Sequence, residues 1–330
     1  MSSPEIITQD YLIDSQDPKI KLHVREKRPK GKREFSNSET LLMCHGRIGA
    51  GPIAFDLPVP GYSWMDYHAG KGMNVFTLSV RGFGFSSRPK EFLEDPLKNP
   101  PVIRGKEAIK DIASVVNFIC RKKKKRKISL LGRSWGTTLS AAFAASNPTK
   151  VHKLVLYAPY YTYQNKKRAA SFENPKFPGK WDARKGAWSW CTEKDLKKRW
   201  WGHIPGKKHF QWRDKKIVEE YFKEMFKTET EQHPKNIPAV RISNGSLLDA
   251  YDRVSNKPLY NASKVTCPVL LIYGDYDGAA NHEEAWGLFQ KLKNSKGREY
   301  IVFSEGTHYM ELEHRREEFL STIHNFLISS

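Results

Sequence analysis

Residues 130–139 read LLGRSWGTTL and place the pattern G-x-S-x-G between an apolar run and a stretch of small residues. The run at Ile128–Leu131 is typical of a buried strand, and Thr137–Asn147 is typical of a helix packed tightly against a sheet. A serine on a sharp turn between strand and helix projects its hydroxyl clear of the sheet, and the flanking glycines let neighbouring chains approach. The helix N-terminus adds free N–H groups near a developing oxyanion. We therefore predict that Ser134 is a nucleophile.

Short apolar runs alternate with helical patterns along most of the chain. Strand-length runs in which apolar and polar residues do not alternate, and which are separated by helices, indicate a parallel sheet covered by helices on both faces. The predicted fold class is therefore α/β, with a mostly parallel sheet flanked by helices and an inserted helical cap. The further strands expected are Ile20–Val24, Leu41–Cys44, Val75–Val80, Leu154–Tyr157, Val269–Tyr273 and Tyr300–Phe303, and the further helices are Glu107–Cys120 and Arg316–Leu327.

The segment from residue 160 to residue 264 interrupts this alternation of predicted strands and helices, because it has no clear apolar strand run. Helical spacing appears within it at Lys215–Phe226. We predict that residues 1–159 and 265–330 form an α/β core and that residues 160–264 are an inserted, mainly helical cap. Its aromatic residues could form an apolar pocket wall or a small core of the cap itself, and both interpretations stay open. Six of the nine Trp residues fall in this segment: Trp181, Trp188, Trp190, Trp200, Trp201 and Trp212.

The sequence resembles the alpha/beta hydrolases, and residues 132–139 are similar to the G-x-S-W-G-x-T-L signature of proline-iminopeptidase-like serine hydrolases. The elements of that fold cover nearly the whole chain, and Arg81–Ser86 resembles the family's R-G-x-G-x-S turn. The resemblance implies that an acid and then a histidine follow the nucleophile. The family's acid lies three residues after the glycine that ends a strand, which selects Asp277 over Asp275. His308 lies in a G-x-H turn after the last predicted strand and is expected to be the base.

These residues predict a Ser-His-Asp triad that acts through an acyl-enzyme intermediate. His308 accepts the proton of Ser134, while Asp277 holds the imidazole tautomer. This chemistry requires no metal or cofactor. Three other histidines are badly placed, because one precedes the last predicted strand and two lie beside or in the closing helix: His282, His314 and His324.

The pair His45-Gly46 follows a predicted strand, and in the family such a pair opens the loop that supplies one oxyanion N–H. The resemblance implies that the N–H groups of Arg47 and Trp135 form the oxyanion hole, where one donor is worth about 3 kcal/mol. The loop reads HGRIG in place of the iminopeptidase HGGPG, which argues against peptidase specificity. We expect the Arg47 side chain to point to solvent, with binding of a substrate carboxylate as the alternative. His45 is expected at the substrate-binding pocket as a hydrogen-bonded residue rather than as a base.

Further substrate contacts are expected near the start of the cap. Tyr160 and Tyr161 follow a predicted strand end and either line the pocket or pack at the base of the cap. Proline iminopeptidases bind a substrate amine with cap carboxylates, and Glu219, Glu220 and Glu224 are the candidates for that role here.

Composition narrows the remaining possibilities. The 330 residues carry 56 Lys+Arg against 36 Asp+Glu, a formal net charge of +20, and 39% are hydrophobic, which indicates a packed core. No run of about 18 apolar residues exists, so we predict no membrane span. Four widely spaced Cys indicate neither a zinc site nor a disulfide framework, and we expect a cytoplasmic protein. The excess of Lys is spread along the chain, which favours no specific nucleic acid partner. The dense run at residues 121–127 is interpreted as a solvated loop, with anionic-surface binding as the alternative.

The leading hypothesis is a serine hydrolase, a carboxylesterase that cleaves a small or medium apolar ester. The alternatives are a proline-iminopeptidase-like aminopeptidase and a lactonase or acyltransferase that uses the same triad. A binding protein with the hydrolase fold is a further alternative, which an intact Ser, Asp and His set disfavours. The sequence carries no indication of the oligomeric state.

Overall fold

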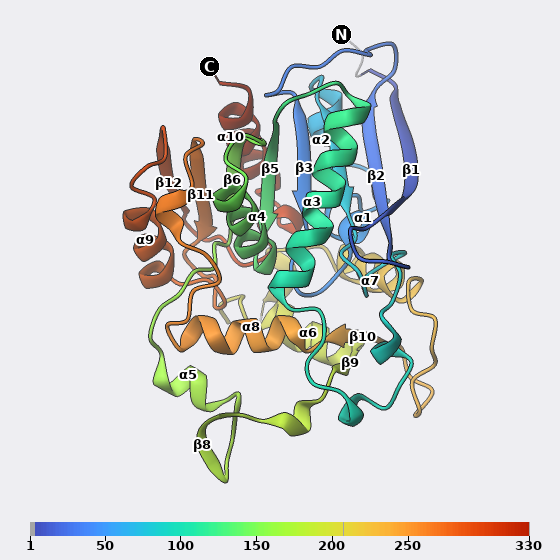
Figure 1. The fold of residues 1–330 in the computed structure, drawn as a ribbon. Coiled ribbons are helices and arrows are strands. Elements are labelled where there is room, and N and C mark those ends of the chain that lie inside the picture. Colours follow the sequence, from blue (N-terminus) through green and yellow to red (C-terminus); the bar gives the residue numbers. More distant parts are fainter. Residues whose placement is uncertain (1–3, 207, 330) are drawn as a thin grey trace.

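Eight strands form one mixed sheet in the order β1-β2-β4-β3-β5-β6-β11-β12 (Figure 1) in the computed structural model, which describes residues 4–206 and 208–329. The strands β1 and β2 pair antiparallel, as do β2 and β4, and all other neighbours pair parallel. The predicted α/β class with a mostly parallel sheet is confirmed. The strands are β1 (Ile6–Asp14), β2 (Lys21–Pro29), β3 (Thr40–Cys44), β4 (Asn74–Leu78), β5 (Ile128–Arg133), β6 (Val151–Tyr157), β11 (Val269–Gly274) and β12 (Arg298–Phe303).

Helices cover both faces of the sheet because the side chains of the central strands alternate between two hydrophobic clusters. In β3, Leu42 and Cys44 belong to the cluster under α3 and α4, whereas Leu41 and Met43 belong to the cluster under α2 and α10. All four side chains are fully buried, so these strands show no polar alternation in the sequence. The helices are α1 (Gly51–Phe55), α2 (Trp64–Gly70), α3 (Gly105–Lys122), α4 (Trp135–Ser146), α9 (His282–Lys291) and α10 (Arg316–Ile328).

Edge strand β1 differs in kind from these central strands. Its residues alternate between exposed and half-buried positions, and the sequence analysis contains no strand there because no apolar run marks it. The strand pairs only with β2, over the whole register from Ile6–Pro29 to Asp14–Lys21. It widens the sheet at one edge, and the residues that follow it, Ser15 and Asp17, contact Arg81 just beyond the end of β4.

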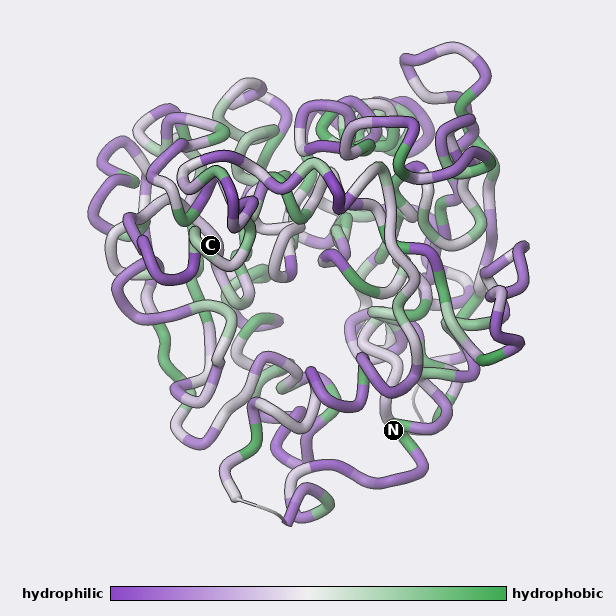
Figure 2. The backbone as a smooth tube through the Cα atoms, turned by 90° about the horizontal axis from the view of Figure 1, so that it is seen from below, coloured by the Kyte–Doolittle hydropathy of each residue, from purple (hydrophilic) through white to green (hydrophobic). Residues whose placement is uncertain are grey.

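Residues 160–264 lie below the carboxyl ends of the parallel strands (Figure 1). Besides its helices, this segment contains two short two-stranded sheets, β7-β8 and β9-β10, which the sequence analysis does not mark. These strands escape the sequence analysis because they are only two to five residues long, and most of their residues are polar or only half-buried aromatic ones. The elements are α5 (Lys166–Ala170), β7 (Glu173–Asn174), β8 (Phe177–Trp181), β9 (Trp188–Thr192), α6 (Glu193–Trp201), α7 (Lys215–Phe226), β10 (Ala239–Ser243) and α8 (Gly245–Val254). Seen from this side (Figure 2), hydrophilic residues occupy most of the outer loops.

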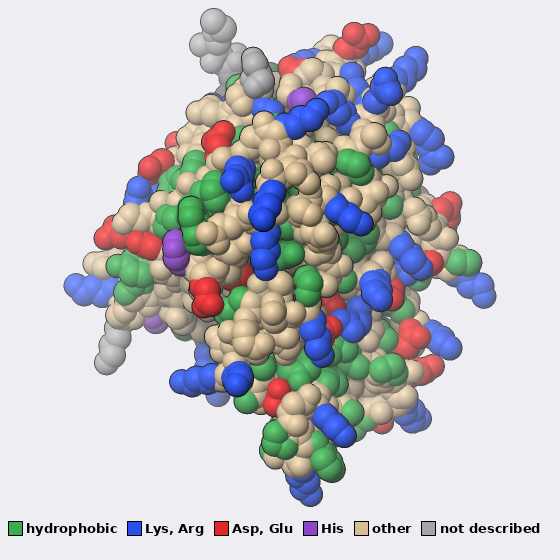
Figure 3. Space-filling model, turned by 60° about the vertical axis from the view of Figure 1, so that its left-hand side comes forward, with side chains coloured by type: hydrophobic (Ala, Val, Ile, Leu, Met, Phe, Trp, Pro, Cys, Tyr) green, Lys and Arg blue, Asp and Glu red, His purple; other side chains and the backbone are tan. Residues whose placement is uncertain are grey.

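The basic charge is distributed over the surface. Lys and Arg side chains extend from top to bottom of the face shown in Figure 3, interspersed with acidic ones. Within the run at residues 121–127, Lys123 is not simply solvated, because its ammonium lies 2.5 Å from the buried Glu26 carboxylate and 5.7 Å from the Phe76 ring centre. Among the described residues, none of the helices combines the length and the apolar composition needed to span a bilayer.

Candidate active site

Ser134 lies between β5 and α4 in a strained backbone conformation. Its φ of 56° and ψ of −121° are rarely adopted by residues other than glycine. The turn is held because the Ser134 N–H donates to the Tyr157 carbonyl at 2.9 Å. A Cβ on Gly132 would lie 2.3 Å from the carbonyl oxygen of Gly136, and a Cβ on Gly136 would lie 2.3 Å from that of Cys44. Both glycines of the motif are therefore required by close backbone packing.

The second part of the site joins two loops at the carboxyl ends of β11 and β12. His308 Nδ1 lies 2.8 Å from Asp277 Oδ2 and 2.9 Å from Oδ1. Asp277 Oδ1 also accepts hydrogen bonds from the N–H groups of Ala279 and Ala280, at 2.8 and 2.9 Å. The carboxylate is thereby fixed with its second oxygen directed at the imidazole. This arrangement places the ring proton on Nδ1 and leaves Nε2 free to accept another.

Burial and neighbouring charge set the protonation of this pair. Burial raises the pKa of Asp277, but the His308 ring and the two backbone donors outweigh burial and hold that pKa below its usual range. Burial lowers the pKa of His308, against the opposing effect of Asp277, and the nearby cations Arg133 and Arg199 lower it further. At neutral pH the pair is therefore a carboxylate and a neutral imidazole, the form in which a histidine acts as a base.

Ser134 and His308 border one small cavity of about 10 Å³, which has room for about one water molecule. Both side chains are nearly inaccessible, with exposed fractions of 3% and 1%. Among the described residues, no hydrogen bond joins Ser134 Oγ to the imidazole, a contact that often tightens only when substrate is bound. The structure thus brings Ser134, Asp277 and His308 into one site.

The rival candidates lie elsewhere. Asp275 is exposed, and its carboxylate accepts only a long bond of 3.3 Å from the Gly306 N–H. The three rival histidines contact residues outside the small cavity: His282 bonds Tyr273, His314 bonds Phe210 and His324 stacks on His68.

Two backbone N–H groups are available beside Ser134. Trp135 is the first residue of α4, so its N–H has no acceptor within the helix. The N–H of Arg47 has no backbone carbonyl partner among the described residues. The loop that carries Arg47 passes close to the nucleophile, because a Cβ on Gly46 would lie 3.1 Å from Ser134 Cβ. These two donors come from the elements that the resemblance implies for an oxyanion hole.

His45 has a different position from the one expected at the substrate pocket. Its side chain is fully buried and borders neither cavity. Nδ1 donates to the Gly46 carbonyl at 2.7 Å, while Nε2 accepts from the Val80 N–H at 3.0 Å. Burial lowers the pKa of His45 to about 4, so the ring is neutral. The structure therefore corrects the assignment of His45 to substrate binding, because both ring nitrogens are used to hold the loop.

A larger cavity of about 320 Å³ also has Ser134 in its lining. Tyr160 and Tyr161 border it, and Tyr160 also stacks against the His308 ring at 6.2 Å between centres. None of the six Trp residues of the 160–264 segment borders this cavity. One of them, Trp200, borders the smaller one and packs on Tyr221 with ring centres 4.5 Å apart.

The Arg47 side chain does not point to solvent, which makes the favoured expectation wrong. Arg47 is half-buried, borders both cavities and has a buried Nε without a hydrogen-bond partner. The Arg47 side chain instead lies near the cap, where Arg199 of α6 and Cys191 of β9 are close enough to affect its pKa.

Two contacts around the site could not be read from the sequence. The buried Arg133, inside the serine motif, pairs with Glu311 at 2.8 Å and donates to the His308 carbonyl at 3.0 Å. His203 stacks on His308 with ring centres 5.5 Å apart, and its Nδ1 accepts from the Gly278 N–H at 2.8 Å. Both pairs join residues far apart in the chain, and no local pattern marks them.

No group of three or more potential metal ligands occurs within residues 4–206 and 208–329.

A family model for the alpha/beta hydrolase fold matches residues 39–314 of this chain. A comparison with curated proteins finds no significant match.

Solved structures with the same fold cover nearly the whole chain at low identity. A thermophilic esterase from Thermogutta terrifontis is 16% identical, with a TM-score of 0.60 over 97% of this chain and 98% of its own. Est816, described as an N-acyl homoserine lactone degrading enzyme, is 15% identical, with a TM-score of 0.61 over 94% and 99%. The thioesterase domain from the curacin biosynthetic pathway is 12% identical, with a TM-score of 0.57 over 98% and 100%. The chain belongs to the alpha/beta hydrolase family.

Proposed function

We propose that this protein is a serine hydrolase that cleaves a carboxylic ester through Ser134, His308 and Asp277. The observation that carries the proposal is the buried Asp277–His308 pair, whose histidine borders the same cavity as a serine held in a strained turn. Such pairing of a nucleophile with an oriented base is the requirement for covalent acyl transfer.

In the proposed reaction, Ser134 Oγ attacks the ester carbonyl carbon while His308 Nε2 takes the hydroxyl proton. The N–H groups of Arg47 and Trp135 hold the oxyanion of the tetrahedral intermediate. The intermediate then collapses: the bond to the alcohol oxygen breaks, and the proton on Nε2 passes to the leaving alcohol. A water molecule, deprotonated by His308, attacks the acyl-enzyme and releases the acid, which restores Ser134.

The cavity favours an ester over an aminoacyl substrate. A prolyl substrate needs a free carboxylate to bind its amine, and the three candidates are engaged elsewhere: Glu219 with Lys215, Glu220 with Lys223 and Glu224 with Lys227. The two carboxylates that border the cavity, Asp249 and Asp252, are both paired with Arg104. A volume of about 320 Å³ suits a small or medium substrate.

Hydrolysis of a paired panel tests this proposal. The panel holds p-nitrophenyl esters of increasing acyl length, a lactone, and prolyl and other aminoacyl anilides, each with wild type and with Ser134→Ala. Ser146→Ala, an exposed serine at the end of the same helix, is the matched control. We expect ester turnover that Ser134→Ala abolishes and Ser146→Ala retains. Ester turnover that survives in Ser134→Ala, or anilide cleavage alone, contradicts the proposal.

A further inference from the structure

Three residues border both the small and the large cavity: Arg47, Ser134 and Arg199. Arg47 enters from the loop after β3, and Arg199 enters from α6. Their guanidinium groups are close enough that the charge of Arg199 lowers the pKa of Arg47, in addition to the larger effect of burial, to about 10. Arg47 therefore still carries its charge at neutral pH. Two like charges thus flank the candidate nucleophile.

Neither of these two arginines has an anionic partner. Among the described residues, no carboxylate lies within 4.0 Å of the Arg47 or Arg199 guanidinium. Arg199 Nε donates to the neutral Tyr309 hydroxyl at 3.2 Å, and Arg47 Nε is buried without any partner. The fully buried arginines of the chain are paired, as in Arg133 with Glu311. Arg47 and Arg199 are half-buried, so each has lost part of its hydration without gaining a counter-ion, and a ligand that supplies the missing negative charge is favoured there.

The charge of the larger cavity also favours a negatively charged ligand. Its lining has seven Lys and Arg residues and two Asp residues, so it is formally positive by 7 − 2 = +5. Arg104 pairs with both Asp residues, and Arg253 is paired with Glu284 outside the lining at 2.7 Å. Apolar and aromatic side chains also contribute to the lining: Phe172, Leu247, Pro258, Leu259 and Tyr260. The cavity therefore combines apolar side chains with two unpaired cations beside the nucleophile.

We propose that the substrate is an ester that carries a carboxylate a few bonds from the scissile carbonyl. Arg47 and Arg199 bind this carboxylate, and the remaining hydrocarbon of the substrate packs against the apolar side chains of the lining. This inference rests on the proposed ester hydrolysis and names its substrate class. Guanidinium groups hold carboxylates through paired, charge-assisted hydrogen bonds, which fixes the ester relative to Ser134. The carboxylate belongs either to the acyl part or to the alcohol part of the ester.

The test compares acidic esters with neutral esters of the same shape. Monoethyl succinate against ethyl isocaproate places the charge in the acyl part, and acetoxyacetate against isobutyl acetate places it in the alcohol part. Hydrolysis is followed by acid release at constant pH. We expect one acidic ester to exceed its neutral partner in kcat/KM by 10-fold or more, about the effect of one hydrogen bond to a charged group. The preferred pair identifies the part that carries the carboxylate.

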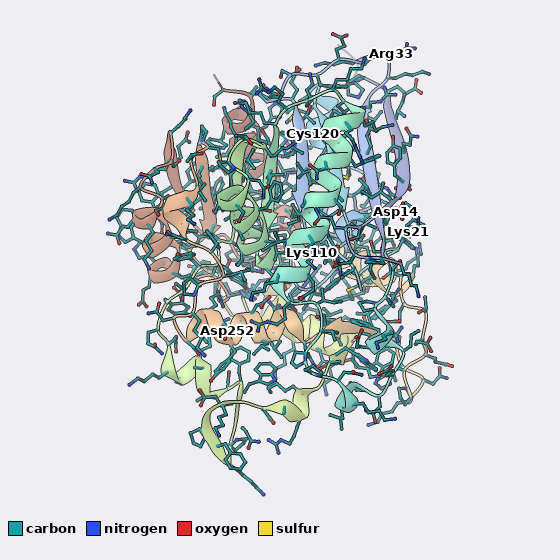
Figure 4. The ribbon with its side chains drawn as sticks, in the orientation of Figure 1. Asp14, Lys21, Arg33, Lys110, Cys120 and Asp252 are labelled. Carbon is teal, nitrogen blue, oxygen red and sulfur yellow. The ribbon has the colours of Figure 1, made fainter. Side chains whose placement is uncertain are left out.

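Arg199→Met and Arg199→Lys connect this preference to the site. In Arg199→Met the ratio of acidic to neutral kcat/KM falls by about 10- to 100-fold, and Arg199→Lys recovers part of it. The control Arg126→Met removes the same charge from an exposed turn after α3 and leaves the ratio unchanged. That turn follows Cys120 at one end of the molecule, whereas α8 with Asp252 lies at the other (Figure 4). Because the readout is a ratio, partial misfolding of a variant does not imitate the result.

A binding measurement separates the two proposals. Succinate is titrated calorimetrically into wild type and into Arg199→Met; we expect binding that the variant weakens at least 10-fold. Neutral and acidic esters cleaved equally, with a ratio that Arg199→Met does not change and no succinate binding, overturn the carboxylate site while leaving ester hydrolysis intact. Succinate binding that depends on Arg199, with no ester cleaved through Ser134, retains the carboxylate site and overturns the proposed hydrolysis.

Discussion

Replacement of Asp277 by Asn tests whether Asp277 fixes the tautomer of His308 in the proposed mechanism. Asp277 Oδ1 accepts the N–H groups of Ala279 and Ala280, so the asparagine must keep its oxygen at that position. Its NH₂ group then occupies the Oδ2 position, 2.8 Å from His308 Nδ1. The retained oxygen stays 2.9 Å from Nδ1, but an NH₂ group donates and repels a proton on Nδ1, so the tautomer with the ring proton on Nε2 is favoured. In that tautomer His308 cannot take the proton of Ser134.

The size of the effect follows from the loss of the base. The wrong tautomer in a Ser-His-Asp triad lowers kcat by about 10⁴-fold. At 1.36 kcal/mol for each factor of ten, this corresponds to about 5.5 kcal/mol of transition-state stabilisation. The fold should persist, because the asparagine preserves both backbone bonds and removes a buried charge.

The assay measures kcat for the best p-nitrophenyl ester, with thermal unfolding of each variant as a check of folding. Asp275→Asn is the matched control, because it removes the same charge from an exposed carboxylate two residues away. We expect Asp275→Asn to stay within about 2-fold of wild type, as is usual for exposed sites. A folded Asp277→Asn protein with more than a tenth of the wild-type kcat refutes the assigned role of Asp277.

Three other predictions concern protonation, packing and charge around the site. Since burial lowers the pKa of His308 and the neutral ring is the active form, kcat/KM should fall only on the acid side, with a midpoint below 6.5; a midpoint above 7 contradicts this. In Gly136→Ala the new methyl group meets the Cys44 carbonyl oxygen at 2.3 Å, so soluble folded protein and ester turnover should both be lost, and a folded, active variant argues against the turn geometry. Arg133→Met leaves Glu311 buried without its partner and should lower the free energy of unfolding by about 3–5 kcal/mol in urea titrations. The additional change Glu311→Gln should recover part of this loss, and no recovery is evidence that the pair is not coupled.

The central part of the fold was predictable because local patterns and long-range packing agree there. The strand β5, the serine turn and α4 are continuous in sequence. The residues of β5 are all buried in the centre of the sheet, and the small residues of α4 are buried as well. The predicted boundaries of the central strands differ from the observed ones by a few residues at most. The edge strand β1 and the strands β8 and β9 lack such a pattern, because their residues are exposed or only half-buried. The strand β10 is buried, but it is only five residues long and includes Arg241 and Ser243.

The site itself was only partly accessible from sequence. Ser134, Asp277 and His308 follow recognisable strand ends, and the structure places them together. The contacts of side chains were less accessible. His45 has a bonding partner, Val80, that lies 35 residues away, and Arg47 meets Arg199 on a helix 152 positions further along the chain. Burial of a loop arginine depends on which distant segment packs over the loop, and the residues next to Arg47 in the sequence do not indicate that segment.

The most direct test of the central claim is to find the nucleophile by covalent labelling. The protein is treated with an alkyl fluorophosphonate, whose phosphorus is attacked by an activated serine, and the adduct is located by mass spectrometry. The proposed mechanism predicts one adduct, on the peptide that contains Ser134, with labelling slowed strongly in His308→Gln and absent in Ser134→Ala. A folded protein without an adduct, or with its adduct on another serine, contradicts the assignment of Ser134 as the nucleophile.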